Sequence, residues 1–211
     1  MEVDIIYDTV CPWCFIGKRR FEEALALRPE IKIKPNWKPF LLNPGMPLDG
    51  IDRSAYLIKK FGSEARIRRI YGAISDAGLS VEINFGFDLI GRAPNSVNSH
   101  RLVRFADTFA KATQAVEAVF VEHFIKGRDI GRRDVLCDIA EQLELDIDKL
   151  NVLLDSDDDI HAILSENTKV HSLGINGVPA YLFNGKMAIS GAQDAEVLAR
   201  MLDVASLTQA A

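Results

Sequence analysis

The N-terminal part of the chain alternates between strand-like and helix-like hydrophobic patterns. The apolar run at residues 3–7 is bounded by acidic residues and predicts a short buried strand. Apolar side chains at residues 15–25 recur at helical spacing. Residues 31–40 then alternate apolar and basic side chains and predict a second strand, which Pro35 and Pro39 interrupt or end. The order strand, helix, strand has the crossover length of a parallel βαβ unit.

The middle of the chain has the hydrophobic period of helices. A loop rich in proline and glycine at residues 43–50 precedes it. Residues 81–89 carry polar and glycine residues and are expected to be irregular. On either side of this irregular segment, apolar residues recur at helical spacing in six stretches: residues 67–74, 102–109, 116–125, 136–143, 150–154 and 157–164.

Strand signals return after Gly174. An apolar run at residues 178–183 precedes Asn184-Gly185, a dipeptide that favours a tight hairpin turn, and residues 186–189 supply the partner strand. An amphipathic helix at residues 193–205 follows. The pattern therefore predicts an α/β protein with a βαβ unit, a block of helices, a β-hairpin and a last helix.

Composition and charge exclude several classes of function. The 211 residues are 48% hydrophobic and 26% charged, as in an ordinary globular protein. Thirty acidic against 25 basic residues give a net charge of −5, so neither nucleic-acid nor membrane binding through excess positive charge is expected. No apolar run approaches the roughly 18 residues that span a bilayer. The first residues form neither a basic region nor an apolar leader, so we expect a cytoplasmic protein.

The three cysteines, Cys11, Cys14 and Cys137, are too few for a disulfide framework. Because cytoplasmic thiols are mostly kept reduced, a close pair indicates catalysis or metal binding rather than a structural disulfide. A structural zinc site takes four ligands, and the histidines of this chain form no pair at ligand spacing, so no metal is expected. Cys137 lies beside the apolar face of a predicted helix and is expected to be buried and unreactive.

The sequence Cys11-Pro12-Trp13-Cys14 lies where the first predicted strand passes into the first predicted helix. Free N–H groups and a partial positive charge at a helix N-terminus stabilise a thiolate, and Pro12 suits the first helical position. We therefore expect Cys11 to be the reactive thiol. Cys14 lies one turn inside the helix, is expected to be more buried and would resolve the mixed disulfide. Trp13 is expected to be an exposed contact surface for substrate.

Two motifs and the helical block between them resemble a known family. Cys11-Pro-Trp-Cys14-Phe-Ile-Gly17 and Gly177-Val-Pro-Ala-Tyr181 are similar to the DsbA family of thioredoxin-like oxidoreductases, most closely to its cytoplasmic, FrnE-like branch. The resemblance covers essentially the whole chain. It implies a thioredoxin-like α/β fold with a large all-helical insertion. Residues 1–50 and 174–211 would form the thioredoxin-like domain and residues 51–173 the insertion.

The resemblance also implies roles for residues outside the cysteine pair. Val178-Pro179 would be a cis peptide, with Pro179 against the cysteines and the Val178 backbone pairing with a bound substrate strand. Asn95, Ser96 and His100 belong to a stretch that resembles one facing the active-site groove in this branch. Capping of the following helix by Asn95 or Ser96 is an equally good interpretation.

The implied activity is thiol–disulfide exchange with protein or peptide thiols, as a disulfide oxidoreductase or isomerase. No cofactor is expected beyond the redox-active Cys11–Cys14 pair, with glutathione as a candidate co-substrate. The alternative is a glutathione-dependent isomerase or kappa-type glutathione transferase of the same architecture. Those enzymes usually have serine at the first motif position and lack the second cysteine, so the presence of both argues against them. A binding or chaperone module is a further alternative.

One position departs from the wider thioredoxin-like pattern. Many such proteins place a buried carboxylate six residues before the first cysteine, and here that position is Ile5. Asp4 and Asp8 lie on either side of Ile5 in the sequence. In an alternating strand, however, their side chains would point elsewhere than that of Ile5. Protons for Cys14 would then come from water or from substrate thiols.

Overall fold

The computed structural model describes residues 1–208. By its internal contacts the chain divides into two compact units. The first combines Met1–Phe40 with the segment that begins at Ser165, and the second is Leu41–Leu164. The boundaries expected from the sequence, after residues 50 and 173, lie within ten residues of these positions.

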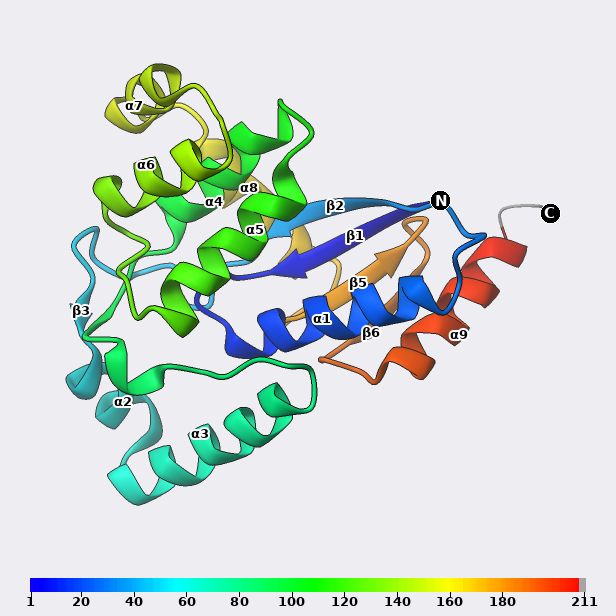
Figure 1. Cartoon of the computed structure of the whole chain (residues 1–211), viewed down its shortest axis with the longest axis horizontal. Coiled ribbons are helices and arrows are strands. Elements are labelled where there is room, and N and C mark those ends of the chain that lie inside the picture. Colours follow the sequence, from blue (N-terminus) through cyan, green and yellow to red (C-terminus); the bar gives the residue numbers. More distant parts are fainter. Residues whose placement is uncertain (209–211) are drawn as a thin grey trace. The chain divides into compact units, whose positions relative to one another are not determined.

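A four-stranded sheet with the order β2-β1-β5-β6 forms the centre of the first unit (Figure 1). Strand β1 (Glu2–Tyr7) pairs in parallel with β2 (Lys34–Pro39) and antiparallel with β5 (Ala180–Phe183). Strand β6 (Met187–Ser190) is antiparallel to β5. Helix α1 (Pro12–Ala26) connects β1 to β2, which confirms the predicted parallel βαβ unit.

The predicted hairpin is also confirmed. Asn184 and Gly185, between β5 and β6, have φ angles of 49° and 66°, the positive values that a tight hairpin turn requires.

Strand β2 runs through Pro35 without interruption and ends at Pro39, so of the two expected breaks only the one at Pro39 is confirmed. The amides of Lys34 and Phe40 donate to carbonyls of residues 1 and 7, so the backbone N–H groups at even positions of this segment point toward β1. At the odd positions, where both prolines lie, the backbone nitrogen points away from β1. An edge strand needs donors on one side only, so these prolines remove no bond within the sheet.

Helices α1 and α9 (Ala195–Leu207) lie side by side (Figure 1) and pack on the sheet. The guanidinium of Arg28, which follows the end of α1, donates hydrogen bonds of 2.6 and 2.8 Å to the Asp203 carboxylate of α9. Buried residues from β1, β5 and both helices form the core beneath them: Val3, Ile5, Phe21, Ala24, Tyr181, Phe183, Leu198, Ala199, Leu202 and Ala205.

The second unit is mostly helical (Figure 1). Its α-helices are α2 (Arg53–Phe61), α3 (Glu64–Leu79), α4 (Val97–Asp107), α5 (Ala112–Phe120), α6 (Arg133–Gln142) and α7 (Ile147–Asp155). Its other elements are the 3₁₀ turn η1 (Phe87–Leu89), the π-helical turn η2 (Val121–Ile125) and the paired strands β3 (Ile51–Asp52) and β4 (Arg92–Ala93). Helix α8 (Ile160–Ser172) begins in this unit and ends in the first.

Each of the six helical stretches predicted from the sequence overlaps a helix of the structure. Helix α2, whose nine residues bury only Leu57, was not predicted as a separate helix. No helix among residues 1–208 is long and apolar enough to cross a bilayer.

Candidate functional site

Cys11 and Cys14 lie at the start of α1, as the sequence predicts. Cys11 is the N-cap residue, with an extended backbone (φ −99°, ψ 111°), and Pro12 is the first helical residue. The Cys14 amide donates to the Cys11 carbonyl at 3.0 Å, which closes the first turn around the pair. Both cysteines are free thiols, so the structure presents the reduced form of the pair.

The two thiols differ more in their surroundings than in their exposure. Cys11 is 4% exposed and Cys14 is 2% exposed, so the contrast expected from the sequence is small. Burial raises the pKa of Cys14 well above its usual value, and the neighbouring Cys11 thiol raises it further. A hydrogen bond from the Asp8 amide to the Cys14 sulfur acts in the opposite direction. Cys14 is therefore protonated at neutral pH.

The second motif lies beside the first cysteine. The Val178–Pro179 peptide bond is cis, which confirms the prediction. The Cys11 thiol donates a hydrogen bond to the Val178 carbonyl, with 3.7 Å between sulfur and oxygen. The segment before β5 thus presents backbone atoms directly to Cys11.

Gly17, one turn beyond Cys14 on α1, allows this close approach. A Cβ atom at Gly17 would lie 2.6 Å from the Tyr181 hydroxyl and 2.8 Å from Cγ of Pro179. Both distances are too short for carbon, so any side chain here would displace Pro179 or Tyr181. Gly17 belongs to the quoted family motif, but nothing in the sequence assigned it this packing role.

Tyr181 was also missed as a neighbour of the cysteines. Its ring stacks on Phe21 with centroids 5.3 Å apart, and its hydroxyl is buried with no hydrogen-bond partner among the described residues. Burial raises the pKa of Tyr181 far above its usual value, and the charge of Cys14 adds to the effect. Tyr181 of β5 lies opposite Ile5 of β1 in the sheet, and Ile5 is the position where many thioredoxin-like proteins have a buried carboxylate.

Asp8 lies closer to the cysteine pair than the sequence indicated. Its side chain is completely buried, and its backbone contacts both cysteines. Its carbonyl accepts from the Cys11 amide at 3.0 Å, and its amide donates to the Cys14 sulfur. Strand β1 ends at Tyr7, so the alternation used for the expectation does not extend to Asp8. Asp4, inside the strand, instead accepts a hydrogen bond from Asn36.

Trp13 is 37% exposed, in agreement with the expected contact surface between the cysteines. Its part in substrate binding stays a prediction.

Asn95, Ser96 and His100 are buried residues of the second unit. The Asn95 side chain accepts from the Val97 amide at 2.9 Å and donates to the Met46 carbonyl at 2.7 Å, which favours the structural interpretation of this residue. Ser96 is the N-cap of α4, but its side chain makes no capping bond. A substrate-lining role for the three residues stays a prediction.

Cys137 is partly exposed, which corrects the expectation that it lies in the core. Helix α6 buries Val135, Leu136, Ile139 and Ala140, and Cys137 lies beside this stripe rather than within it. Its thiol donates to Oδ1 of Asn151 across 3.5 Å.

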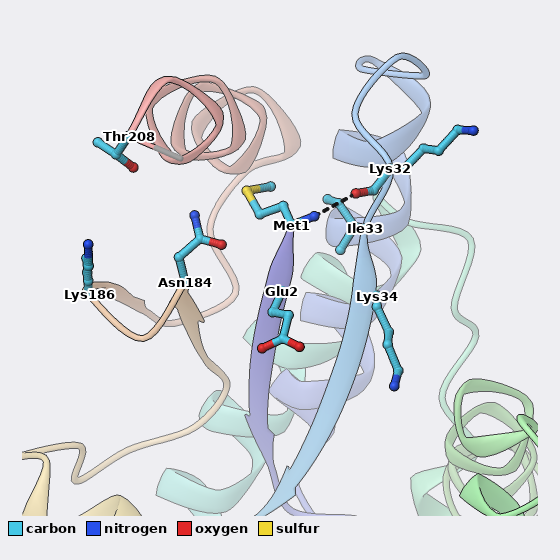
Figure 2. A pocket seen from close by; sticks show the side chains of 8 residues that line it. All are labelled: Met1, Glu2, Lys32, Ile33, Lys34, Asn184, Lys186 and Thr208. Atoms are coloured by element: carbon cyan, nitrogen blue, oxygen red, sulfur yellow. Dashed lines mark hydrogen bonds between the residues drawn. The ribbon is translucent and has the colours of Figure 1, made fainter. Parts of the chain in front are cut away.

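An open cavity of about 860 Å³ lies in the first unit, by the start of β1 (Figure 2). The residues that line it include Glu2 of β1, Lys34 of β2 and Asn184 of the hairpin turn. Cys11 follows the other end of β1, so this cavity is separate from the cysteine pair.

The whole chain resembles known thioredoxin-like proteins. Residues 2–203 match the model of the DSBA-like thioredoxin domain. The uncharacterised protein YwbO of Bacillus subtilis is 29% identical over 146 residues, which cover 69% of this chain and 68% of that protein.

Solved structures agree with this match. A "probable DsbA oxidoreductase" from Streptomyces coelicolor has a TM-score of 0.89 at 25% identity, with 97% of this chain and 89% of that chain covered. The cytosolic disulfide reductase DsbM from Pseudomonas aeruginosa, solved with GSH, has a TM-score of 0.71 at 15% identity, with 97% and 98% covered, and shows the fold alone. The match over nearly all of the sequence shows that this chain belongs to the family of DsbA-like thioredoxin-domain oxidoreductases.

Proposed function

We propose that the protein exchanges disulfides with protein or peptide thiols through Cys11 and Cys14. The observation that carries the proposal is the unequal placement of the two free thiols. Cys11 caps α1 and bonds to the Val178 backbone, whereas Cys14 is held protonated one turn inside the helix. A nucleophile at the helix start and a resolving thiol behind it are what a dithiol exchange needs.

In the reductive direction, the Cys11 thiolate attacks one sulfur of a substrate disulfide. The substrate S–S bond breaks, and its other sulfur leaves as a thiolate that takes a proton. Cys14 then loses its proton and attacks the Cys11 sulfur of the mixed disulfide. The Cys11–Cys14 disulfide forms, the second substrate thiolate leaves, and two electrons have passed to the substrate. Oxidation of substrate thiols is the same sequence in reverse.

Substrate contacts are proposed on both sides of Cys11. The Val178 backbone, which accepts from the Cys11 thiol, would pair with an extended substrate segment next to the reacting sulfur. The exposed Trp13 would cover the apolar part of such a segment from the other side.

We place the protein in the FrnE-like branch and in the cytoplasm, where a dithiol of this kind acts as a reductase or isomerase. The Cys11-Pro-Trp-Cys14 motif with Gly177-Val-Pro supports the branch. The similarly folded DsbM is a cytosolic disulfide reductase solved with GSH, which supports glutathione as co-substrate. The glutathione-dependent isomerase or transferase is less well supported, because both cysteines of the motif are present.

Reduction of insulin by glutathione tests the proposal. Wild-type protein is expected to accelerate insulin precipitation over the uncatalysed reaction. Cys11→Ser should abolish the acceleration, and Cys14→Ser should trap a mixed disulfide that mass spectrometry detects. Cys137→Ser, which changes a thiol outside the pair, is the matched control and should retain full activity. No acceleration by the wild type, or full activity of Cys11→Ser, would refute the proposal.

A further inference from the structure

Helix α8 ends at Ser172, a few residues before Val178. Beyond the helix, the Ile175 amide donates to the Val170 carbonyl at 3.3 Å, and Gly174 has a φ angle of 79°. These are the features of a Schellman motif, in which a residue with positive φ ends the helix. The side chains of Val170 and Ile175 are both buried. The backbone is therefore fixed as far as Ile175.

The next three residues, Asn176, Gly177 and Val178, have no such support from the backbone. None of them makes a backbone–backbone hydrogen bond with another residue in the described part of the chain. The chain is held again at Pro179, whose carbonyl accepts from a backbone amide at 2.7 Å. Unbonded backbone groups are what a substrate strand needs beside Cys11. A segment without internal bonds, however, loses conformational entropy when it is ordered by a substrate.

The Asn176 side chain supplies support that the backbone lacks. Its amide nitrogen donates to the Gly174 carbonyl at 3.2 Å, so its oxygen faces the His171 ring, with 3.4 Å between Oδ1 and Nδ1. Because an amide oxygen can only accept, Nδ1 carries the hydrogen and donates it. Both ends of the Asn176 amide are thus bonded to residues at the end of α8.

His171 is itself held by a buried neighbour. Its ring packs against Phe40, with the ring centroids 4.7 Å apart. Phe40 is buried, and its amide donates at 2.8 Å to the carbonyl of Tyr7, the last residue of β1. Strand β1 also leads to Cys11, so one end of the sheet supports both the reacting thiol and His171.

We propose that His171 and Asn176 are positioning residues for extended peptide substrates. They hold the backbone before Pro179 in the conformation that pairs with a substrate segment, so less conformational freedom is lost on binding. Neither side chain takes part in the chemical step, so their effect should appear in the binding of peptides. The inference rests on the proposed exchange function, because only a substrate that pairs with Val178 would depend on this support.

Single-turnover oxidation of the reduced protein separates binding from chemistry. The protein is mixed with an extended peptide that contains one disulfide, or with glutathione disulfide, and the reaction is quenched in acid. The remaining thiols are labelled with N-ethylmaleimide and counted by mass spectrometry. The dependence of the rate on peptide concentration gives a half-saturating concentration and a limiting rate.

Asn176→Ala and His171→Phe should each raise the half-saturating concentration of the peptide about two- to tenfold, the range of one hydrogen bond. The limiting rate should change by less than about twofold, as expected when binding alone is weakened. His171→Phe keeps a ring against Phe40 but has no N–H, whereas His171→Gln keeps a donor and should recover most of the binding. The double variant should bind the peptide no worse than Asn176→Ala alone, because both changes remove the same bond.

His161→Ala is the matched control and should bind the peptide like the wild type. His161 is an exposed histidine of the same helix and makes no hydrogen bond or ring contact with the described residues. The side chains of His171 and Asn176 are also exposed, so their variants should fold like the wild type, which circular dichroism checks.

Glutathione disulfide is too short to pair along the segment, so its reaction should be slowed less than that of the peptide. Equal losses with both disulfides, or a reduced limiting rate at the wild-type half-saturating concentration, would overturn the inference. Wild-type peptide binding by both Asn176→Ala and His171→Phe would overturn it as well. A wild-type protein that neither disulfide oxidises would instead refute the proposed function.

Discussion

The Cys11 thiol donates a hydrogen bond to the carbonyl of Val178, a residue 167 positions later in the chain. This contact joins the start of α1 to the segment that enters β5. It places the reacting sulfur next to backbone atoms that can also pair with a substrate strand.

The raised pKa of Cys14 predicts selective alkylation. Iodoacetamide reacts with thiolates, so the raised pKa of Cys14 should make it the slower of the two cysteines to be modified. Cys14 should become reactive only above about pH 9, because burial and Cys11 raise its pKa above the usual range. Peptide mass spectrometry of the reduced protein measures both sites, with urea-unfolded protein as the control. Labelling of Cys14 before Cys11 would contradict this assignment.

Alkaline pH should destabilise the reduced protein. Cys14, Tyr7 and Tyr181 have pKa values raised by burial, so their neutral forms are favoured in the folded state. Their contribution to the free energy of unfolding is fully present below the pKa values of the same groups in the unfolded chain, which are near 8.5 for thiols and 10 for phenols. Above these pH values the unfolded chain ionises first, and each group then lowers the stability by up to about 1.4 kcal/mol per pH unit.

Urea unfolding at pH 7, 9 and 10.5 measures this loss. Cys14→Ala should remove the part that begins near pH 8.5. Tyr181→Phe should remove only its own share of the part that begins near pH 10, because Tyr7 contributes to that part as well. Equal free energies of unfolding at pH 7 and 10.5 would count against the buried, neutral state of these groups.

Gly17→Ala should disturb the contact between α1 and Pro179. The new methyl group would overlap the Pro179 ring and the Tyr181 hydroxyl, and overpacking of this kind costs about 1–3 kcal/mol of stability. Insulin reduction should fall with it, because Pro179 would move relative to Cys11. Gly72→Ala is the control, since Gly72 lies within α3 with nothing within 4 Å of an added Cβ, and it should stabilise by about 0.5–1 kcal/mol. Unchanged activity and stability of Gly17→Ala would show that the packing is not needed.

Trp13→Ala should affect substrate binding without affecting the fold. Trp13 is partly exposed, so its removal should change the free energy of unfolding by less than about 0.5 kcal/mol. The KM for a peptide disulfide should rise severalfold, whereas glutathione disulfide, which offers little apolar surface, should react at nearly the wild-type rate. Equal effects on both substrates would exclude a peptide-contact role.

The sequence predicted the parts of the site that depend on local rules. Cys11 at a helix start, Pro12 in the first turn and the Asn184-Gly185 hairpin each follow from the residues themselves. The cis bond before Pro179 was accessible only through the family resemblance, because a single proline at the start of a strand is compatible with either isomer.

The remaining features depend on contacts distant in sequence or on where an element ends. The burial of Asp8 follows from the end of β1 at Tyr7, a boundary that hydrophobic alternation does not locate. The need for glycine at position 17 follows from the approach of Pro179, more than 160 residues away. Cys137 was assigned to the core because its neighbours on α6 are apolar, although its direction on the helix leaves it partly exposed.

The prolines of β2 limit how well another strand can pair with this edge of the sheet. On the outer side of β2, Pro35 and Pro39 have no N–H to offer, so Trp37 is left as the donor between them. An edge with so few donors is a poor template for aggregation or for a visiting peptide. An extended chain is therefore expected to pair poorly along β2, so this edge should not compete with the substrate pairing proposed beside Cys11.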